Sequence, residues 1–189
     1  AAISRWALTG ELHDHDVYAS ALSYRTGPSP LDEPTPQAHH IDAALVGAGS
    51  VGGAAVYTLA HTPNLDGSLV IVDPQNLEEH NVVRALLATV DAVNRRDGKA
   101  VIAHGALVHH SSLRAMRIDT DVTAYHATLA QDATLPLTLI AVDSVDSRRK
   151  VQDCLPLDVV NAACHPAEVT VSVHRTDDGP CVCCLHIED

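Results

Sequence analysis

The chain has 189 residues, which is enough for a single domain with a sizeable hydrophobic core. Its formal net charge is −12 and no basic face is visible in the sequence, which argues against a nucleic-acid partner. The chain has no Phe, one Trp and four Tyr, so its core must be aliphatic, which suits a sheet covered by helices.

The longest strongly apolar run, residues 137–142, is too short to cross a bilayer, and the first residues do not resemble a signal peptide. Five cysteines, three of them close together near the end, fit a reducing compartment better than a disulfide scaffold. We therefore expect no membrane partner and a cytoplasmic location.

The first 40 residues are predicted to be an N-terminal segment and a linker. Residues 26–40 contain four prolines, Pro28, Pro30, Pro34 and Pro36, which favour an extended chain. A nucleotide-binding domain is predicted to occupy residues 41–189. The chain starts with Ala and ends just after its cysteine cluster, so we expect this domain to be truncated at the C-terminus.

A glycine-rich turn is the strongest local signal in the sequence. Residues 41–46 are mostly apolar and predict a buried strand, and residues 50–60 predict an amphipathic helix. Between them lies a G-x-G-x-x-G pattern formed by Gly47, Gly49 and Gly52. A strand, this turn and a helix N-terminus together form the phosphate-binding arrangement of nucleotide-binding α/β folds.

Strands alternate with helices along the rest of the chain. Strands are predicted over residues 68–72, 135–142, 158–162 and 168–174, and helices over residues 98–110 and 145–154. The last strand alternates apolar and polar residues, so we expect it to be antiparallel and half exposed. Either Asp143 or Ser144 can cap the second helix. The expected fold is α/β, with a Rossmann-like, mainly parallel sheet flanked by helices and antiparallel strands near the C-terminal end.

Charged residues follow the predicted strand ends, where ligands of open α/β sheets bind. Asp73 closes the strand over residues 68–72 and is placed to accept hydrogen bonds from ribose hydroxyls. Arg84 can bind phosphate oxygens with two hydrogen bonds, and Lys99 adds a point charge. Asp143 can hold a Mg²⁺ ion that bridges phosphates. This set predicts a site that stabilises charge during transfer at a phosphate, with Arg84, Lys99 and Asp143 as candidate catalytic residues.

Three further basic residues, Arg148, Arg149 and Lys150, lie at the start of the helix that follows Asp143. We interpret them as a solvated basic turn. The alternative is a role in binding phosphates or the tail of a partner.

The order of these elements resembles the ThiF/MoeB/HesA group of E1-like activating enzymes. The resemblance covers about residues 41–185, nearly everything after the linker. The residues that carry it are Gly47, Gly49, Gly52, Asp73, Leu77, Glu78, Asn81, Arg84, Gly98, Lys99, Ala100, Asp143, Pro180, Cys181, Cys184 and Leu185. It implies an ATP- and Mg²⁺-dependent adenylyltransferase that acts on the C-terminal carboxylate of a ubiquitin-like or sulfur-carrier protein, or of a peptide, and works as a homodimer.

The family's pattern also implies a role for each residue of the site. Asp73 would hold the ribose, Asn81, Arg84 and Lys99 the phosphates, and Asp143 the magnesium ion. The chain departs from the pattern at Gln75, where the family often has a second Asp, and at Ala85, where it often has Gln. Both departures affect the details of nucleotide contact.

Two of the cysteines have the spacing of half a zinc site. Cys181 and Cys184 are three residues apart, as in tetrahedral zinc sites, and Cys183 is an additional thiol. Two ligands do not hold structural zinc, so a second pair beyond Asp189 would be needed, as the resemblance implies.

Two other cysteines, Cys154 and Cys164, are candidate nucleophiles. Cys164 lies beside His165, which could act as a base and activate the thiol for thioester formation. However, Cys164 follows a predicted core strand, and Cys154 is expected to pack on a helix face.

Two alternative functions belong to other classes. An NAD-dependent oxidoreductase would need only the glycine-rich turn and Asp73. A catalytically inactive scaffold would bind a nucleotide or a partner without turnover. Neither alternative requires Arg84, Lys99 and Asp143 together.

Overall fold

A computed structural model of the chain describes residues 18–19, 26–27, 38–129, 137–165 and 168–186. The chain divides into two compact units, Ala1–Gln37 and Ala38–Asp189, which are described separately. In the first unit, the strand β1 (Tyr18–Ala19) pairs with β2 (Thr26–Gly27) in an antiparallel ladder. The division of the sequence after residue 40 into a linker and a nucleotide-binding domain stays a prediction.

The second unit alternates strands and helices. Its elements are β3 (His39–Val46), α2 (Ser50–Ala60), β4 (Leu65–Val72), η1 (Glu79–Asn81), α3 (Val90–Asn94), α4 (Lys99–His110), β5 (Arg114–Ile118), α5 (Val122–Thr128), β6 (Leu137–Ile140), α6 (Val145–Asp153), β7 (Asp158–His165), β8 (Glu168–Arg175) and η2 (Val182–His186).

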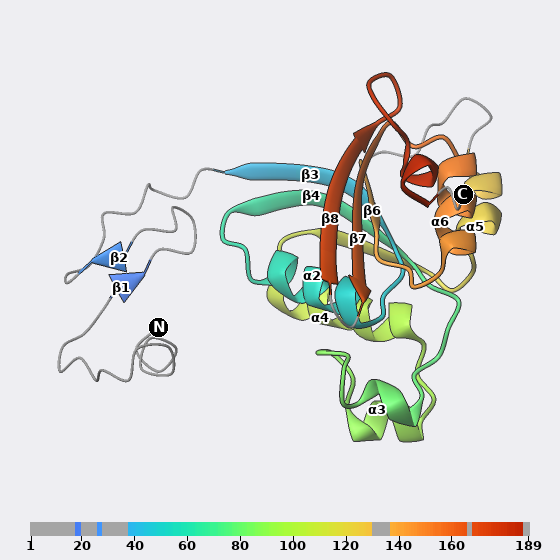
Figure 1. Cartoon of the computed structure of the whole chain (residues 1–189). Helices are drawn as coiled ribbons and strands as arrows, with labels where there is room; N and C mark the ends of the chain where they lie inside the picture. Colours follow the sequence, from blue (N-terminus) through green and yellow to red (C-terminus); the bar gives the residue numbers. More distant parts are fainter. Residues whose placement is uncertain (1–17, 20–25, 28–37, 130–136, 166–167, 187–189) are drawn as a thin grey trace, which may run out of the picture. The chain divides into compact units, whose positions relative to one another are not determined.

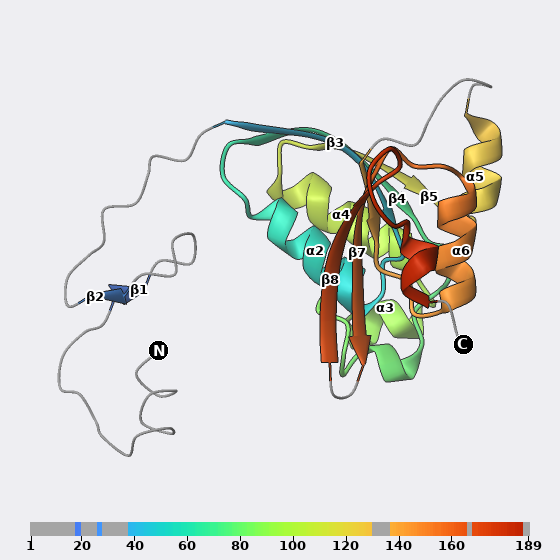
Figure 2. The same cartoon turned by 45° about the horizontal axis from the view of Figure 1, so that its top comes forward.

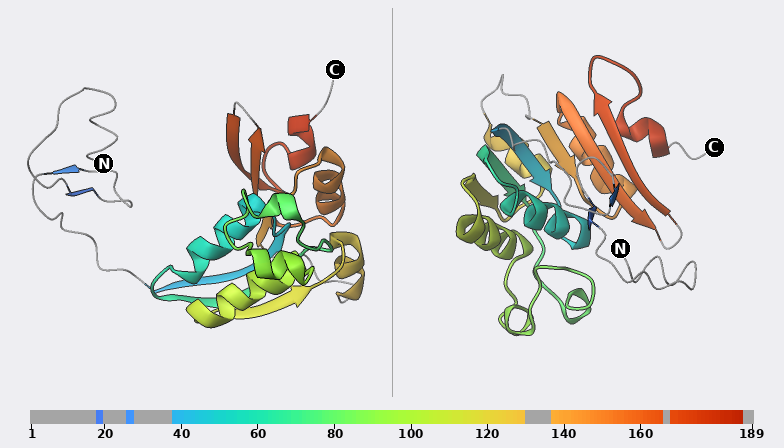
Figure 3. Two further views of the ribbon diagram at one scale, coloured as in Figure 1. Left: turned by 90° about the horizontal axis from the view of Figure 1, so that it is seen from below. Right: turned by 90° about the vertical axis from the view of Figure 1, so that its left-hand side faces the viewer.

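The strands of this unit form one six-stranded sheet in the order β5-β4-β3-β6-β7-β8 (Figure 1). The first five strands are parallel, and β8 runs antiparallel to β7 at one edge (Figure 3). The expected α/β fold, with a mainly parallel sheet and an antiparallel strand near the C-terminal end, is confirmed. After β3, the chain first adds β4 and β5 on one side of it and then β6, β7 and β8 on the other side. At such a switch point, a crevice forms between the carboxyl ends of the two central strands, here β3 and β6.

Helices cover both faces of the sheet (Figure 2). Successive side chains of a strand point to opposite faces, so β3 contributes to two hydrophobic clusters. Leu45 packs with Leu107 of α4 in the cluster under α2 and α4. Val46 packs with Val72 and Val151 in the cluster under α5 and α6. The glycine-rich turn after β3 is therefore anchored from both sides.

The start of α6 resolves which residue caps this helix. The Ser144 hydroxyl accepts a hydrogen bond from the Ser147 backbone N–H at 3.1 Å and serves as the N-cap. Asp143 is therefore not the cap, and its carboxylate remains available beside the crevice.

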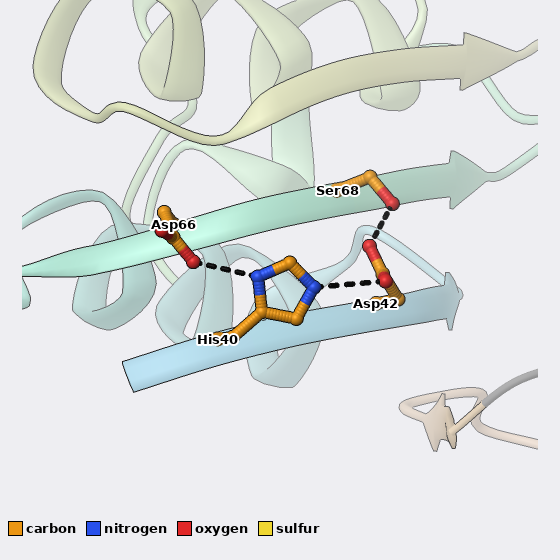
Figure 4. Close-up of polar contacts among 4 residues, drawn as sticks. All are labelled: His40, Asp42, Asp66 and Ser68. Carbon is orange, nitrogen blue, oxygen red and sulfur yellow. Dashed lines mark hydrogen bonds and ion pairs between the residues drawn. The ribbon is translucent and has the colours of Figure 1, made fainter. Parts of the chain in front are cut away.

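At the opposite end of β3 and β4, four polar side chains form an exposed cluster (Figure 4). His40 Nε2 lies 3.0 Å from Asp42 Oδ2, and His40 Nδ1 lies 2.6 Å from Asp66 Oδ1. The Ser68 hydroxyl donates to Asp42 at 2.5 Å. Hydrogen bonds with Asp42 and then Asp66 raise the pKa of His40, because only the charged imidazole donates from both nitrogens.

We expect Asp42→Asn to lower the pKa of His40 toward its ordinary value, since it removes the largest cause of the shift. The pKa is raised in the folded state, so the stabilising effect of charged His40 is complete below about pH 6.5 and is lost as pH rises through the folded pKa. An NMR titration of the His40 ring measures this pKa. Asp119→Asn, outside the cluster, is the control, and an equal pKa in Asp42→Asn and the unmodified chain would contradict the prediction.

Candidate functional site

A cavity of about 730 Å³ lies beyond the carboxyl ends of β3, β4, β6 and β7. It is lined by most of the residues that the sequence predicts for the site, namely Gly47, Gly49, Asp73, Asn81, Arg84, Lys99 and Asp143. Segments separated by almost 100 residues thus meet at one place. The structure brings these residues together, and their individual roles stay predictions.

The three glycines of the turn have different surroundings. Gly47 has a φ of +93°, and a Cβ atom there would lie 2.7 Å from the Ala141 carbonyl oxygen. A Cβ atom on Gly52 would lie only 1.9 Å from the Gly47 carbonyl oxygen, so this position packs the helix α2 directly against the turn. Gly49 has no atom within 4 Å of such a position, so its backbone is open to a ligand in the cavity.

Asp73 holds the turn in place through both of its carboxylate oxygens. Oδ2 accepts a hydrogen bond of 2.7 Å from the Ala48 backbone N–H, and Oδ1 accepts one of 2.8 Å from the Gln75 backbone N–H. The side chain is buried, with 6% exposed. Each carboxylate oxygen has a second lone pair, so Asp73 can still accept hydrogen bonds from a ligand.

Asn81 fixes the short turn that presents Arg84. Its side-chain oxygen accepts a 2.8 Å hydrogen bond from the Glu78 N–H, and its carbonyl oxygen accepts one of 3.1 Å from the Arg84 N–H. Asn81 is 2% exposed, and its side-chain NH₂ lacks a partner among the described residues. A buried amide that faces a cavity in this way is suited to bind an anionic or carbonyl oxygen.

Arg84 and Lys99 give the cavity positive charge. Arg84 is exposed and forms no ion pair with any carboxylate that the structure describes. Lys99 Nζ donates to the Gln75 side-chain oxygen at 2.6 Å, and the Lys99 backbone N–H donates to the Gln75 carbonyl at 2.8 Å. Gln75 is neutral, so the charge of Lys99 is not cancelled by this partner.

Asp143 offers a carboxylate without competing contacts. It lines the cavity, is exposed, and has no hydrogen bond or ion pair within the described part of the chain. One carboxylate together with substrate phosphates is a common environment of Mg²⁺ in proteins. The residues therefore fit a magnesium ion shared with a bound nucleotide.

Arg148 corrects the interpretation of residues 148–150 as a solvated turn. Arg149 and Lys150 are exposed, whereas Arg148 is only 4% exposed. Both Arg148 and Lys150 line the cavity. Arg148 and Val151 are three residues apart on the buried face of α6, and this spacing is the signal that could have revealed its burial.

The cysteines near the end of the chain lie close together. Cys181 Sγ and Cys184 Sγ are 3.3 Å apart, and the hydrogen bond from Cys184 lowers the pKa of Cys181. Two zinc-bound thiolates would lie about 3.8 Å apart, so the pair needs only a small adjustment to fit half of a zinc site. The described residues include no group of three or more His, Cys, Asp or Glu side chains that could hold a metal ion.

The other two cysteines have different environments. Cys154 is buried at 4% exposed, as expected for helix packing, and burial raises its pKa. Cys164 is exposed near the end of β7 and lines the cavity, whereas its position next to a core strand had not suggested that it would be accessible.

Within the described ranges, no helix combines the length and apolar character needed to cross a membrane.

A family model described as the ThiF family matches residues 32–189 of the chain. Among curated proteins, the uncharacterized protein y4jF of Sinorhizobium fredii is 30% identical over 185 residues, which is 95% of this chain and 34% of that protein. The chain thus spans about a third of the length of this relative.

Solved structures show the same fold at low identity. Escherichia coli MccB with MccA-N7isoASN has a TM-score of 0.59 and 15% identity, covering 78% of this chain and 44% of MccB. Escherichia coli TcdA, a tRNA N6-threonylcarbamoyladenosine dehydratase, has a TM-score of 0.50 and 22% identity, covering 67% of this chain and 52% of TcdA. The chain spans about half of these structures or less.

We expect Gly52→Ala to destabilise the protein, by about 1–3 kcal/mol, because the new Cβ atom would overlap the Gly47 carbonyl oxygen. Gly105→Ala is the matched control, since Gly105 also lies in a helix but its Cβ position is open. The control should gain up to about 1 kcal/mol from helix propensity. Urea unfolding of both variants measures the difference, and equal stability of the two variants would contradict the tight packing at Gly52.

Proposed function

The chain belongs to the ThiF family, and we propose that it activates a carboxylate by MgATP-dependent adenylation. The observation that carries this proposal is the cavity at the sheet's carboxyl end. It combines an open glycine-rich turn and a buried carboxylate with Arg84 and Lys99, neither of which has a carboxylate partner among the described residues. A triphosphate supplies the negative charge that such a set of groups is suited to bind.

Each residue has a proposed role. Asp73 accepts hydrogen bonds from the ribose hydroxyls, while the open backbone of Gly49 and the N-terminus of α2 bind a phosphate. Asn81, Arg84 and Lys99 bind the remaining phosphate oxygens. A Mg²⁺ ion held by Asp143 would neutralise phosphate charge.

In the proposed reaction, one oxygen of the substrate carboxylate attacks the α-phosphorus of ATP. The bond between this phosphorus and the oxygen that bridges to the β-phosphate breaks, and pyrophosphate leaves. The products are an acyl adenylate and pyrophosphate, so atoms and charge balance without a side-chain nucleophile. The chain's own contribution is to position the two substrates and to supply fixed positive charge.

The proposed substrate is the C-terminal carboxylate of a ubiquitin-like or sulfur-carrier protein, or of a peptide. Support comes from MccB, which has been solved with MccA and with AMPCPP. TcdA carries the name of a tRNA N6-threonylcarbamoyladenosine dehydratase, so structures of this fold differ in what their names say they act on. Membership of the family alone therefore does not identify which carboxylate is the substrate.

We also propose a homodimer in the cytoplasm and, with further ligands, a zinc ion at Cys181 and Cys184. The dimer would explain the exposed apolar face of the edge strand β8. Val169, Val171 and Val173 are 75%, 66% and 72% exposed there. A second copy of the chain could cover this face and the open edge of the sheet.

We expect Arg84→Ala to weaken MgATP binding about ten- to hundredfold, because it removes charge-assisted hydrogen bonds to phosphate. Arg95→Ala is the charge-matched control, since Arg95 is exposed and pairs with Asp97 away from the cavity. Isothermal titration calorimetry measures both affinities. If MgATP bound Arg84→Ala and Arg95→Ala equally well, Arg84 would not hold the phosphates and the proposed role would be wrong.

A further inference from the structure

Arg148 places a buried positive charge on the cavity wall that the nucleotide contacts proposed above do not use. Its side chain comes from α6, close to the end of β7. It is 4% exposed, whereas Arg149 next to it is exposed. The fold therefore buries one of two adjacent arginines, and buries it toward the cavity.

The guanidinium is held by neutral partners. Arg148 Nε donates to Asn161 Oδ1 at 3.1 Å, and Nη2 approaches the Ala162 carbonyl at 3.4 Å. Asn161 is itself 1% exposed and donates to the Ser172 hydroxyl at 3.3 Å. That hydroxyl lies 2.8 Å from His174 Nε2. This partly buried chain of hydrogen bonds fixes the direction of the guanidinium before any ligand binds.

The charge of Arg148 is not neutralised by an ion pair. Within the described residues no carboxylate pairs with it. Burial lowers its pKa, and the more distant charge of Asp143 acts in the opposite direction. A buried charge without a paired ion is costly, and two hydrogen bonds leave three of the five guanidinium N–H groups unused. These features suit a residue that completes its contacts with an anionic oxygen of a ligand.

The position of Arg148 separates it from the proposed nucleotide contacts that follow β4. Asp73, Arg84 and Lys99 follow β4, while Arg148 bonds to β7, three strands away in the order β4-β3-β6-β7. Neighbouring strands are about 4.8 Å apart, so these two strands are separated by about 14 Å. Arg148 therefore lies on the far side of the glycine-rich turn from Arg84 and Lys99, with Asp143, which follows β6, on the same side as Arg148. A second substrate that approaches from β7 would meet Arg148 there.

We infer that Arg148 binds the carboxylate of the acyl substrate, holding the oxygen that does not attack. The inference rests on the proposed adenylation and names the residue that receives its second substrate. A hydrogen bond to one oxygen orients the carboxylate and offsets its repulsion from the phosphates, and it leaves the other oxygen free to attack. The held oxygen becomes the carbonyl oxygen of the acyl adenylate, so the contact continues in the product.

The test compares two probes by calorimetry. AMP carries the nucleotide part alone, and 5′-O-(N-acetylsulfamoyl)adenosine adds an acyl carbonyl to a stable mimic of the adenylate. We expect Arg148→Gln to lower the affinity for the acyl probe at least tenfold and to change the affinity for AMP less than threefold. Arg148→Lys, which keeps the charge, should restore part of the loss and serves as the second variant if Arg148→Gln does not fold. Arg149→Gln is the control and should bind both probes as the unmodified chain does.

Other outcomes overturn the inference in distinguishable ways. An equal loss of affinity for AMP and the acyl probe in Arg148→Gln would make Arg148 a phosphate contact. Unchanged affinity for both probes would make Arg148 a structural residue that only links α6 to β7. If the unmodified chain bound neither probe, the proposed adenylation itself would fail.

Discussion

The two hydrogen bonds accepted by Asp73 are the interaction on which the site depends. One reaches the Ala48 N–H in the glycine-rich turn, and the other reaches the Gln75 N–H just after β4. They tie the ends of two neighbouring parallel strands together inside a buried environment, where a hydrogen bond to a charged group is strong. The turn, the segment that carries Arg84 and the helix that starts at Lys99 are all positioned from this point.

The residues near Asp73 also position the two cations, Lys99 and Arg84. Gln75 accepts hydrogen bonds from both the backbone and the side chain of Lys99, so the lysine is oriented by a neutral amide. Arg84 is set by the short turn that Asn81 closes. A chain with a formal net charge of −12 thus gathers arginine and lysine at one end of its sheet. Such a local reversal of charge attracts anions to the site.

Much of this architecture could be predicted from the sequence because it depends on local patterns. The glycine spacing, the apolar strand before it and the acid after β4 each leave a signal within a few residues, and the mainly parallel sheet follows from alternating strands and helices. The burial of Arg148 could not be predicted this way, since it depends on contacts with Asn161 and Ala162 of β7, which come from another element. The same holds for Asn81, whose side-chain oxygen is used to close a turn while its NH₂ group stays available.

The most direct test of nucleotide choice is thermal unfolding of the chain with MgATP and, separately, with NAD. A ligand that binds only the folded state at 100 times its dissociation constant stabilises it by about 2.7 kcal/mol. The account predicts that MgATP raises the melting temperature by several degrees, that removing magnesium reduces the effect, and that NAD has none. A rise with NAD and none with MgATP would contradict the account and favour an oxidoreductase.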